Sequence, residues 1–108
     1  MASETLLKQV RRKLNITWED DDTTARIEEI MESAIPDLKH RLGISVPDFD
    51  FSVAGDENTL FKNYCLYEWN HCLNEFFVNY AEMIAQVRAR NDVTYYRANN
   101  GVANDAET

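Results

Sequence analysis

The stretch from Leu60 to Tyr80 places the strongest constraint on the fold of this chain. It holds most of the large apolar side chains and contains no Gly or Pro, so it favours one long helix. On a period of 3.6 residues, its apolar side chains cover one broad face and part of a second: Phe61, Cys65, Leu66, Trp69, Cys72, Leu73, Phe76, Phe77 and Tyr80, then Leu60, Tyr64 and Tyr67. Such a helix must be covered from more than one side, either by other helices of its domain or by neighbouring copies.

A first, shorter amphipathic helix is predicted over residues 4–14. Ser3 is a suitable N-cap, and an apolar stripe recurs at helical spacing: Leu6, Leu7, Val10 and Leu14. Because a helix of this length is marginal alone, it must dock on the core through that stripe. In the connection that follows, Ile16 and Trp18 are expected to pin the chain onto the core.

A second amphipathic helix is predicted over residues 23–42. The acidic run at residues 19–22 suits its start, because carboxylates cap free N–H groups and oppose the helix dipole. Gly43 is a natural stop at its C-terminus. Pro36 lies inside the pattern and removes a backbone donor, so we expect a kink or a break near residues 33–35.

Pro, Gly and Asp at close spacing then predict a loop over residues 43–56. Phe49 and Phe51 alternate with aspartates within it, which is the period of an extended segment. Two interpretations remain open. The two rings anchor the loop on the helices, or the segment forms an edge that pairs with a neighbouring subunit.

The central helix is expected to start with Asp56 as its N-cap and to run to residue 90 or 91, with residues 79–80 as the likeliest place for a bend or division. The tail that follows has little apolar periodicity, so it is expected to be flexible alone. The chain is therefore predicted to be all-α. It forms a small bundle of about four helices, with a domain at residues 4–91 and a tail at 92–108.

The charge of the chain argues against general affinity for nucleic acid. Eleven basic and 19 acidic residues leave a net charge of −8, whereas phosphates require a basic surface. Two cysteines seven positions apart on one helix cannot bridge, and reduced thiols fit a cytosolic protein. With no signal-peptide core and no apolar run of membrane-spanning length, a soluble, intracellular protein without membrane contact is expected.

Residues that resemble catalytic or metal sites do not form a complete pattern. Glu68 and His71 have the Glu-x-x-His spacing of di-iron bundles, but no second copy of that pair exists. His71, Cys72 and Glu75 lack the remaining ligands of a zinc site, and a His71 that faces Glu75 one turn on needs no special role. There is no phosphate-binding glycine loop and no oxyanion-hole motif. We expect neither an enzyme nor a cofactor, but a binding or assembly protein.

Several motifs follow one another in a characteristic order between residues 4 and 91. They are Leu7-x-x-Val10-x-x-x-Leu14-Asn15-Ile16, the acidic link Trp18-Glu-Asp-Asp-Asp-Thr, the helix from Arg26-Ile27-Glu-Glu-Ile30 to Leu42-Gly43, Asp48-Phe49-Asp50-Phe51, Tyr64-Cys65-Leu66-Tyr67-Glu68, and Asn74-Glu75-Phe76-x-x-Asn79-Tyr80. None is a catalytic signature, so the specificity lies in their order and spacing. In that order the chain resembles the head-to-tail connector (adaptor) family of long-tailed bacteriophages.

The resemblance implies a structural virion protein at the head–tail interface, made in the host cytoplasm. Members of that family are small helical proteins that assemble as a ring of about twelve copies between the portal and the stopper or tail. The same role is implied here: the ring extends the portal channel, and DNA passes through it without sequence-specific binding. A ring is a heterologous interface closed by rotation, which would use the wide aromatic face and the separated charges.

The resemblance also suggests roles for particular residues. Packing is assigned to Trp69, Phe76 and Phe77. The candidate interface residues, which would contact a neighbouring subunit or the portal, are Lys8, Arg11, Arg12, Phe49, Phe51, Tyr95, Tyr96 and Arg97. The tail at residues 93–108 is expected to order when it docks on the portal.

Other functions compete with this interpretation. The main alternative is a small helical interaction module or regulator that binds a protein partner through its aromatic face as a monomer or dimer. An acidic mimic of DNA would need carboxylates spread along one surface, whereas here they cluster in helix starts and loops.

Overall fold

The computed structural model describes residues 3–96 and is all-α. It contains five helices: α1 (Glu4–Lys13), α2 (Asp21–Arg41), α3 (Asp56–Trp69), α4 (Leu73–Asn79) and α5 (Ala81–Tyr96). No strand occurs between residues 3 and 96. The predicted fold class is confirmed, with one helix more than expected.

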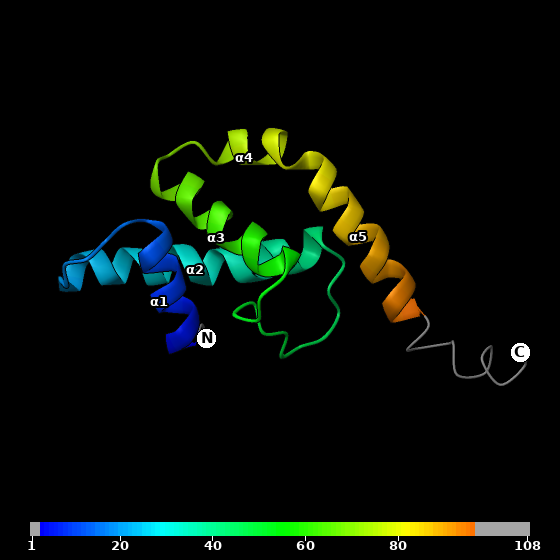
Figure 1. The fold of residues 1–108 in the computed structure, drawn as a ribbon, viewed down its shortest axis with the longest axis horizontal. Coiled ribbons are helices and arrows are strands. Elements are labelled where there is room, and N and C mark those ends of the chain that lie inside the picture. The colour runs from blue at the N-terminus through cyan, green and yellow to red at the C-terminus, as the bar shows by residue number, and fades with distance from the viewer. Residues whose placement is uncertain (1–2, 97–108) are drawn as a thin grey trace, which may run out of the picture.

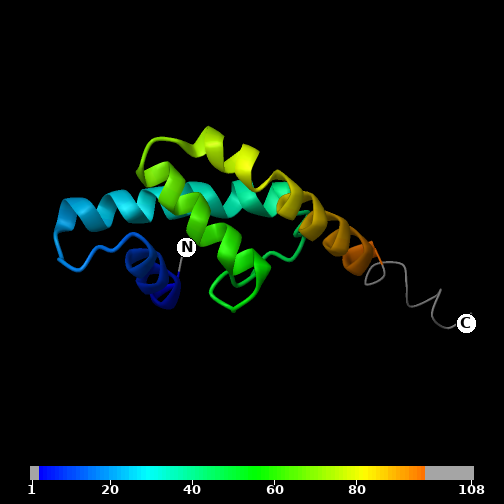
Figure 2. The ribbon, with the colours of Figure 1, turned by 45° about the horizontal axis from the view of Figure 1, so that its top comes forward.

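α2 is the longest helix, and the others are arranged around it (Figure 1). α3 packs against both α2 and α1, and α4 folds back over α3. A second view shows that α5 continues from α4 and leaves the bundle beyond the end of α2 (Figure 2). The C-terminal half of α5 is held at the end of α2 and the start of α3, because Arg88 donates to the His40 carbonyl at 2.9 Å and Arg90 pairs with Asp56 at 3.1 Å.

Side-chain caps fix the starts of the first two helices. The Ser3 hydroxyl accepts from the Leu6 N–H at 3.1 Å, as predicted, and Asp20 accepts from the Thr23 N–H at 3.0 Å. The start of α3 differs from the prediction by one residue. Its N-cap is Gly55 (φ +150°), and Asp56 lies in the first turn, where its charge opposes the helix dipole.

α1, α2 and α3 all end in the same hydrogen-bonded turn, with one residue in the left-handed conformation. That residue is Asn15 (φ +60°), Gly43 (φ +66°) and His71 (φ +61°), respectively. After α3, the His71 N–H donates to the Glu68 carbonyl at 3.0 Å and the Cys72 N–H to the Tyr67 carbonyl at 2.9 Å. This is the Schellman pattern, which satisfies carbonyls at a helix end. Only Gly43 gave a clear sequence signal for it.

The turn at His71 corrects the predicted long helix. The chain divides at residues 70–72 and again at Tyr80, and only the second division was expected. The two cysteines therefore lie on different elements, and both are free thiols. The predicted end at residue 90 or 91 is also wrong, because α5 continues to Tyr96 and takes in the first residues of the expected tail.

A single core runs between the helices. Its fully buried side chains include Val10, Ile27, Met31, Leu38, Leu42, Leu60, Phe61, Cys65, Phe76 and Val87. Of the kink or break predicted near residues 33–35, the break does not occur, because α2 continues through Pro36. The connection after α1 is anchored by Ile16, which is 5% exposed, but not by Trp18, which is 54% exposed. The expectation for Trp18 was wrong, because Arg11 holds the carbonyl of that residue and its ring faces away from the core.

Candidate interaction surfaces

The basic residues of α1 divide into two groups by what they contact. Arg11 is half-buried and donates to the Trp18 carbonyl and to Thr24 Oγ1 (3.4 Å). It therefore fixes the connection between α1 and α2. Lys8 and Arg12 are exposed and form no ion pair within the described residues. Of the three predicted contact residues on α1, these two present a free charge at the surface.

A groove of about 320 Å³ lies beside α1 and is lined by Gln9, Arg12, Lys13 and Lys62. Gln9 is held in place, because its amide donates to the Ser52 carbonyl at 3.0 Å and accepts from the buried Asn58 at 2.7 Å. Lys62 comes from α3, so two helices bring their positive charges to one place. No carboxylate among residues 3–96 pairs with these three cations.

Lys62 is the residue that the sequence analysis missed at this groove. It is the only basic residue of α3, a helix that is otherwise apolar or acidic and polar. A lone Lys on a mainly aromatic helix, facing a basic helix that must dock nearby, is the signal that could have identified it.

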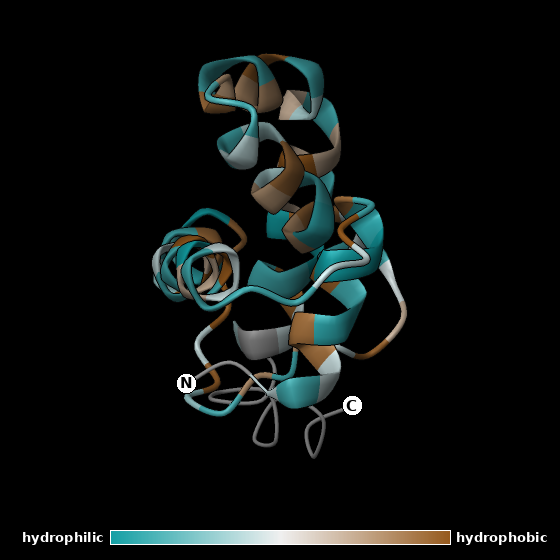
Figure 3. Cartoon of the chain, turned by 90° about the vertical axis from the view of Figure 1, so that its left-hand side faces the viewer, coloured by the Kyte–Doolittle hydropathy of each residue, from teal (hydrophilic) through white to brown (hydrophobic). Residues whose placement is uncertain are grey.

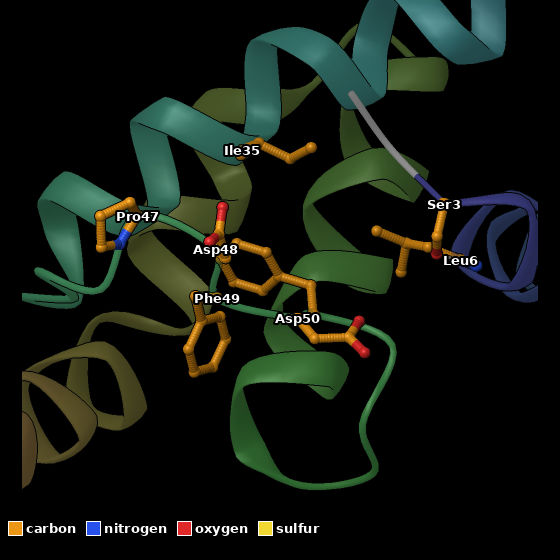
Figure 4. Close-up of a pocket in the computed structure, with 8 residues that line it drawn as sticks. Ser3, Leu6, Ile35, Pro47, Asp48, Phe49 and Asp50 are labelled. Carbon is orange, nitrogen blue, oxygen red and sulfur yellow. Dashed lines mark hydrogen bonds between the residues drawn. The ribbon is translucent and has the colours of Figure 1, made fainter.

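A larger pocket of about 390 Å³ lies where the N-terminal end of α1 meets α2 and the loop (Figure 4). Leu6 and Ile35 contribute apolar side chains from the two helices, and the loop contributes Phe49 and Asp50. The Asp50 carboxylate accepts from the Ser52 hydroxyl and N–H at 2.6 and 2.9 Å, and these hydrogen bonds lower its pKa.

The two phenylalanines of the loop differ in exposure. Phe51 is only 2% exposed and stacks on Phe61 with ring centroids 4.9 Å apart, so it belongs to the core. Phe49 is half-buried and meets Phe51 edge-on at 4.9 Å. Because Phe51 is enclosed within its own chain, only Phe49 of this predicted pair is accessible to a partner. The loop forms no strand, and its rings anchor it on the helices.

The predicted contact residues near the C-terminus lie at the limit of the described chain. Tyr95 and Tyr96 are in the last turn of α5, and Tyr96 is 59% exposed. Arg97 lies outside the described residues. The structure therefore places Tyr95 and Tyr96 at the C-terminal end of α5 (Figure 1).

The wide aromatic face of the central stretch is covered within the chain. Because the chain turns at residues 70–72, α4 lays Phe76 against Tyr64 and Tyr67, with ring centroids 5.5 and 5.8 Å apart. Phe76 is fully buried, and Phe77 and Trp69 pack at the edge of the core, as predicted for these three residues. Two arginines close the rim, Arg26 over Trp69 at 4.2 Å and Arg41 over Phe77 at 3.9 Å.

The buried polar groups of this region serve the packing. The Tyr64 hydroxyl donates to Asp37 at 2.7 Å, and burial together with this bond raises its pKa. Burial raises the pKa of the Cys65 thiol to about 12, so it stays protonated near neutral pH and is not an activated nucleophile. His71 and Glu75 are not one turn apart on a single helix, because α3 ends at Trp69 and α4 begins at Leu73. The Nε2 atom of His71 lies 3.2 Å from Arg26 Nη2.

Residues 3–96 hold neither a candidate metal site nor a candidate membrane span. No three His, Cys, Asp or Glu side chains in this range come together as a possible metal site. None of its helices combines the length and apolar character needed to cross a membrane. Comparisons with protein families, with curated proteins and with solved structures found no match to the chain.

Proposed function

We propose that this chain is a structural virion protein and not an enzyme. About twelve copies form a ring that joins the portal at the capsid vertex to the stopper or tail. The proposal combines the order of sequence motifs, which resembles the head-to-tail connector family, with an all-helical fold. A fold does not fix a function, so the proposal also depends on a surface suited to assembly.

The outward face of α5 is the observation that carries the proposal. Met83, Ile84 and Val87 on its inner face pack on the core. On the opposite face an exposed stripe of small apolar residues recurs at intervals of four, Ala81, Ala85, Ala89 and Val93, with the polar Glu82 and Gln86 beside it. A peripheral helix of a monomer needs only one apolar face, so a second one is expected where another chain covers it.

The proposed assembly surface is the outer face of α5 and not the aromatic face of residues 60–80. From the sequence, the aromatic face of residues 60–80 was the candidate subunit interface, but α4 and the two arginines cover most of it. α5 leaves the bundle beyond the end of α2 (Figure 2). Its outer side is therefore accessible to a neighbouring copy or to the portal. With a net charge of −8, the subunit has little general attraction for the DNA that would pass through the ring.

The α5 face can be tested without disturbing the helix. Ala85→Glu with Ala89→Lys places opposite charges one turn apart, in the order that stabilises a helix. We expect the double variant to fold like the wild type but to lose ring formation on portal-bearing particles, scored by negative-stain electron microscopy. The matched control, Ala25→Glu with Glu29→Lys, makes a similar pair on the exposed side of α2 and should still form rings.

Two further results would separate this function from its rivals. If residues 97–108 dock on the portal, a chain that ends at Tyr96 should bind portal particles more weakly while keeping its helix content. A lasting dimer that ignores portal, in the wild-type chain, would instead favour a regulator. Rings that persist in the α5 double variant would remove α5 as the assembly surface.

A further inference from the structure

We propose that the groove of Gln9, Arg12, Lys13 and Lys62 on one copy receives the connection between α1 and α2 of the next copy. That connection and the first turn of α2 present Trp18 and the acidic residues Glu19 and Asp22. The inference rests on the proposed ring, and it names the two surfaces that would meet at each subunit boundary.

The dipole of α1 accounts for two of the three positive charges at the groove but not for the third. Arg12 and Lys13 lie in the last turn of α1, where cations suit the helix dipole, so they alone need no partner. Lys62 lies in the middle of α3, where the helix dipole does not favour a cation. Three cations line one groove with no carboxylate paired to them in the described chain, which favours an anionic occupant.

The connection after α1 has the complementary composition. Trp18 is 54% exposed and forms no aromatic or cation–π contact within the described residues. Glu19, Asp21 and Asp22 follow it, are exposed, and make no ion pair in this part of the chain. Seen from the end at which α2 begins, the region is largely hydrophilic (Figure 3).

This connection is held in position. Ile16 is buried, Arg11 donates to the Trp18 carbonyl, and Asp20 caps α2, so the backbone is fixed on both sides of the exposed ring. A fixed, exposed Trp beside acidic residues is a strong anchor for a partner surface, because little conformational freedom is lost on binding.

A second copy of this chain is the occupant that the charges favour. The groove and the connection belong to the same chain, yet the structure records no ion pair between them. Two different surfaces that complement each other make a head-to-tail contact, which closes into a ring when its rotation allows. Duplex DNA is the less suitable ligand, since it needs a basic stripe and this subunit is acidic overall.

Charge reversal on each side, followed by mixing, tests the pairing. The groove variant carries Lys13→Glu and Lys62→Glu, and the link variant carries Glu19→Lys and Asp22→Lys. Each alone should lose ring formation on portal-bearing particles by at least ten-fold. An equal mixture should restore it, because copies can alternate with each reversed surface facing its complement. A chain with all four substitutions should also assemble, which controls for net charge and folding.

The outcomes separate this inference from the proposed function. If either variant alone forms rings as well as the wild type, or if mixing restores nothing, the inference is overturned and the ring proposal stands. Salt-sensitive binding to a short DNA duplex, lost only in the groove variant, would also overturn it and assign the groove to nucleic acid.

If the wild-type chain forms no ring on portal particles, the proposed function fails, and crosslinking decides the inference. Carbodiimide joins touching amines and carboxylates, and a mixture of ¹⁴N- and ¹⁵N-labelled wild-type chains reveals which links join two copies. Links from Lys13 or Lys62 to Glu19, Asp21 or Asp22 of another copy would support the contact in a different assembly. Their absence would overturn it.

Discussion

Replacing Phe76 with Ala tests whether α4 really closes the aromatic face of α3. The ring is fully buried and has four aromatic neighbours, with centroids 5.0 to 5.8 Å away. Truncating a buried Phe typically costs about 3–5 kcal/mol, and the lost aromatic pairs place Phe76 in the upper part of that range. Since a domain of this size has roughly 5–15 kcal/mol of stability, Phe76→Ala should remove a large share of it.

The assay is urea unfolding followed by circular dichroism. With a slope of about 1.5 kcal/mol per molar urea, a loss of about 4 kcal/mol lowers the unfolding midpoint by about 2.7 M. Val78→Ala is the matched control, because Val78 lies on the same short helix and is 74% exposed. It should change stability by less than about 0.5 kcal/mol. If Phe76→Ala costs no more than Val78→Ala, α4 does not cover the core as described.

Two further predictions concern the C-terminal half of α5 and the response of stability to high pH. Asn91→Ala removes a buried amide that donates to the Leu42 carbonyl at 2.9 Å, so the free energy of unfolding in urea should fall by about 1–2 kcal/mol. The exposed Thr94→Ala is its control. Burial raises the pKa of Cys65 from 9.0 to about 12, so between these values the folded chain keeps a proton that the unfolded chain loses. The contribution of the thiol to stability is therefore complete below pH 9 and is lost between pH 9 and 12. Urea unfolding from pH 8 to 11 should show this fall, to which Tyr64 adds, and Cys65→Ala should reduce its slope.

Local signals in the sequence predicted the first half of the fold well. Ser3 and the acidic run mark helix starts, because their side chains bond to N–H groups only a few residues away. Gly43 marks a helix end for a similarly local reason. Pro36 was a weaker guide, since the helix continues through it.

The second half depended on tertiary packing, which the sequence pattern does not reveal. His71 adopts a left-handed conformation that costs energy for a residue with a Cβ, and packing of Phe76 on α3 offsets that cost. No Gly or Pro marks this turn, so residues 60–80 were predicted as one helix. The exposure of Trp18 was missed for a related reason: aromatic residues usually indicate a core, whereas this ring is exposed while Arg11 binds the backbone carbonyl of the same residue.

The mass of the complex with portal tests the central proposal most directly. At 12.6 kDa per copy, a ring of about twelve adds about 150 kDa to a purified portal, which native mass spectrometry or light scattering can measure. We expect this stoichiometric increase and its loss in the Ala85→Glu, Ala89→Lys chain. A portal whose mass does not change in the presence of excess wild-type chain would contradict the proposed ring.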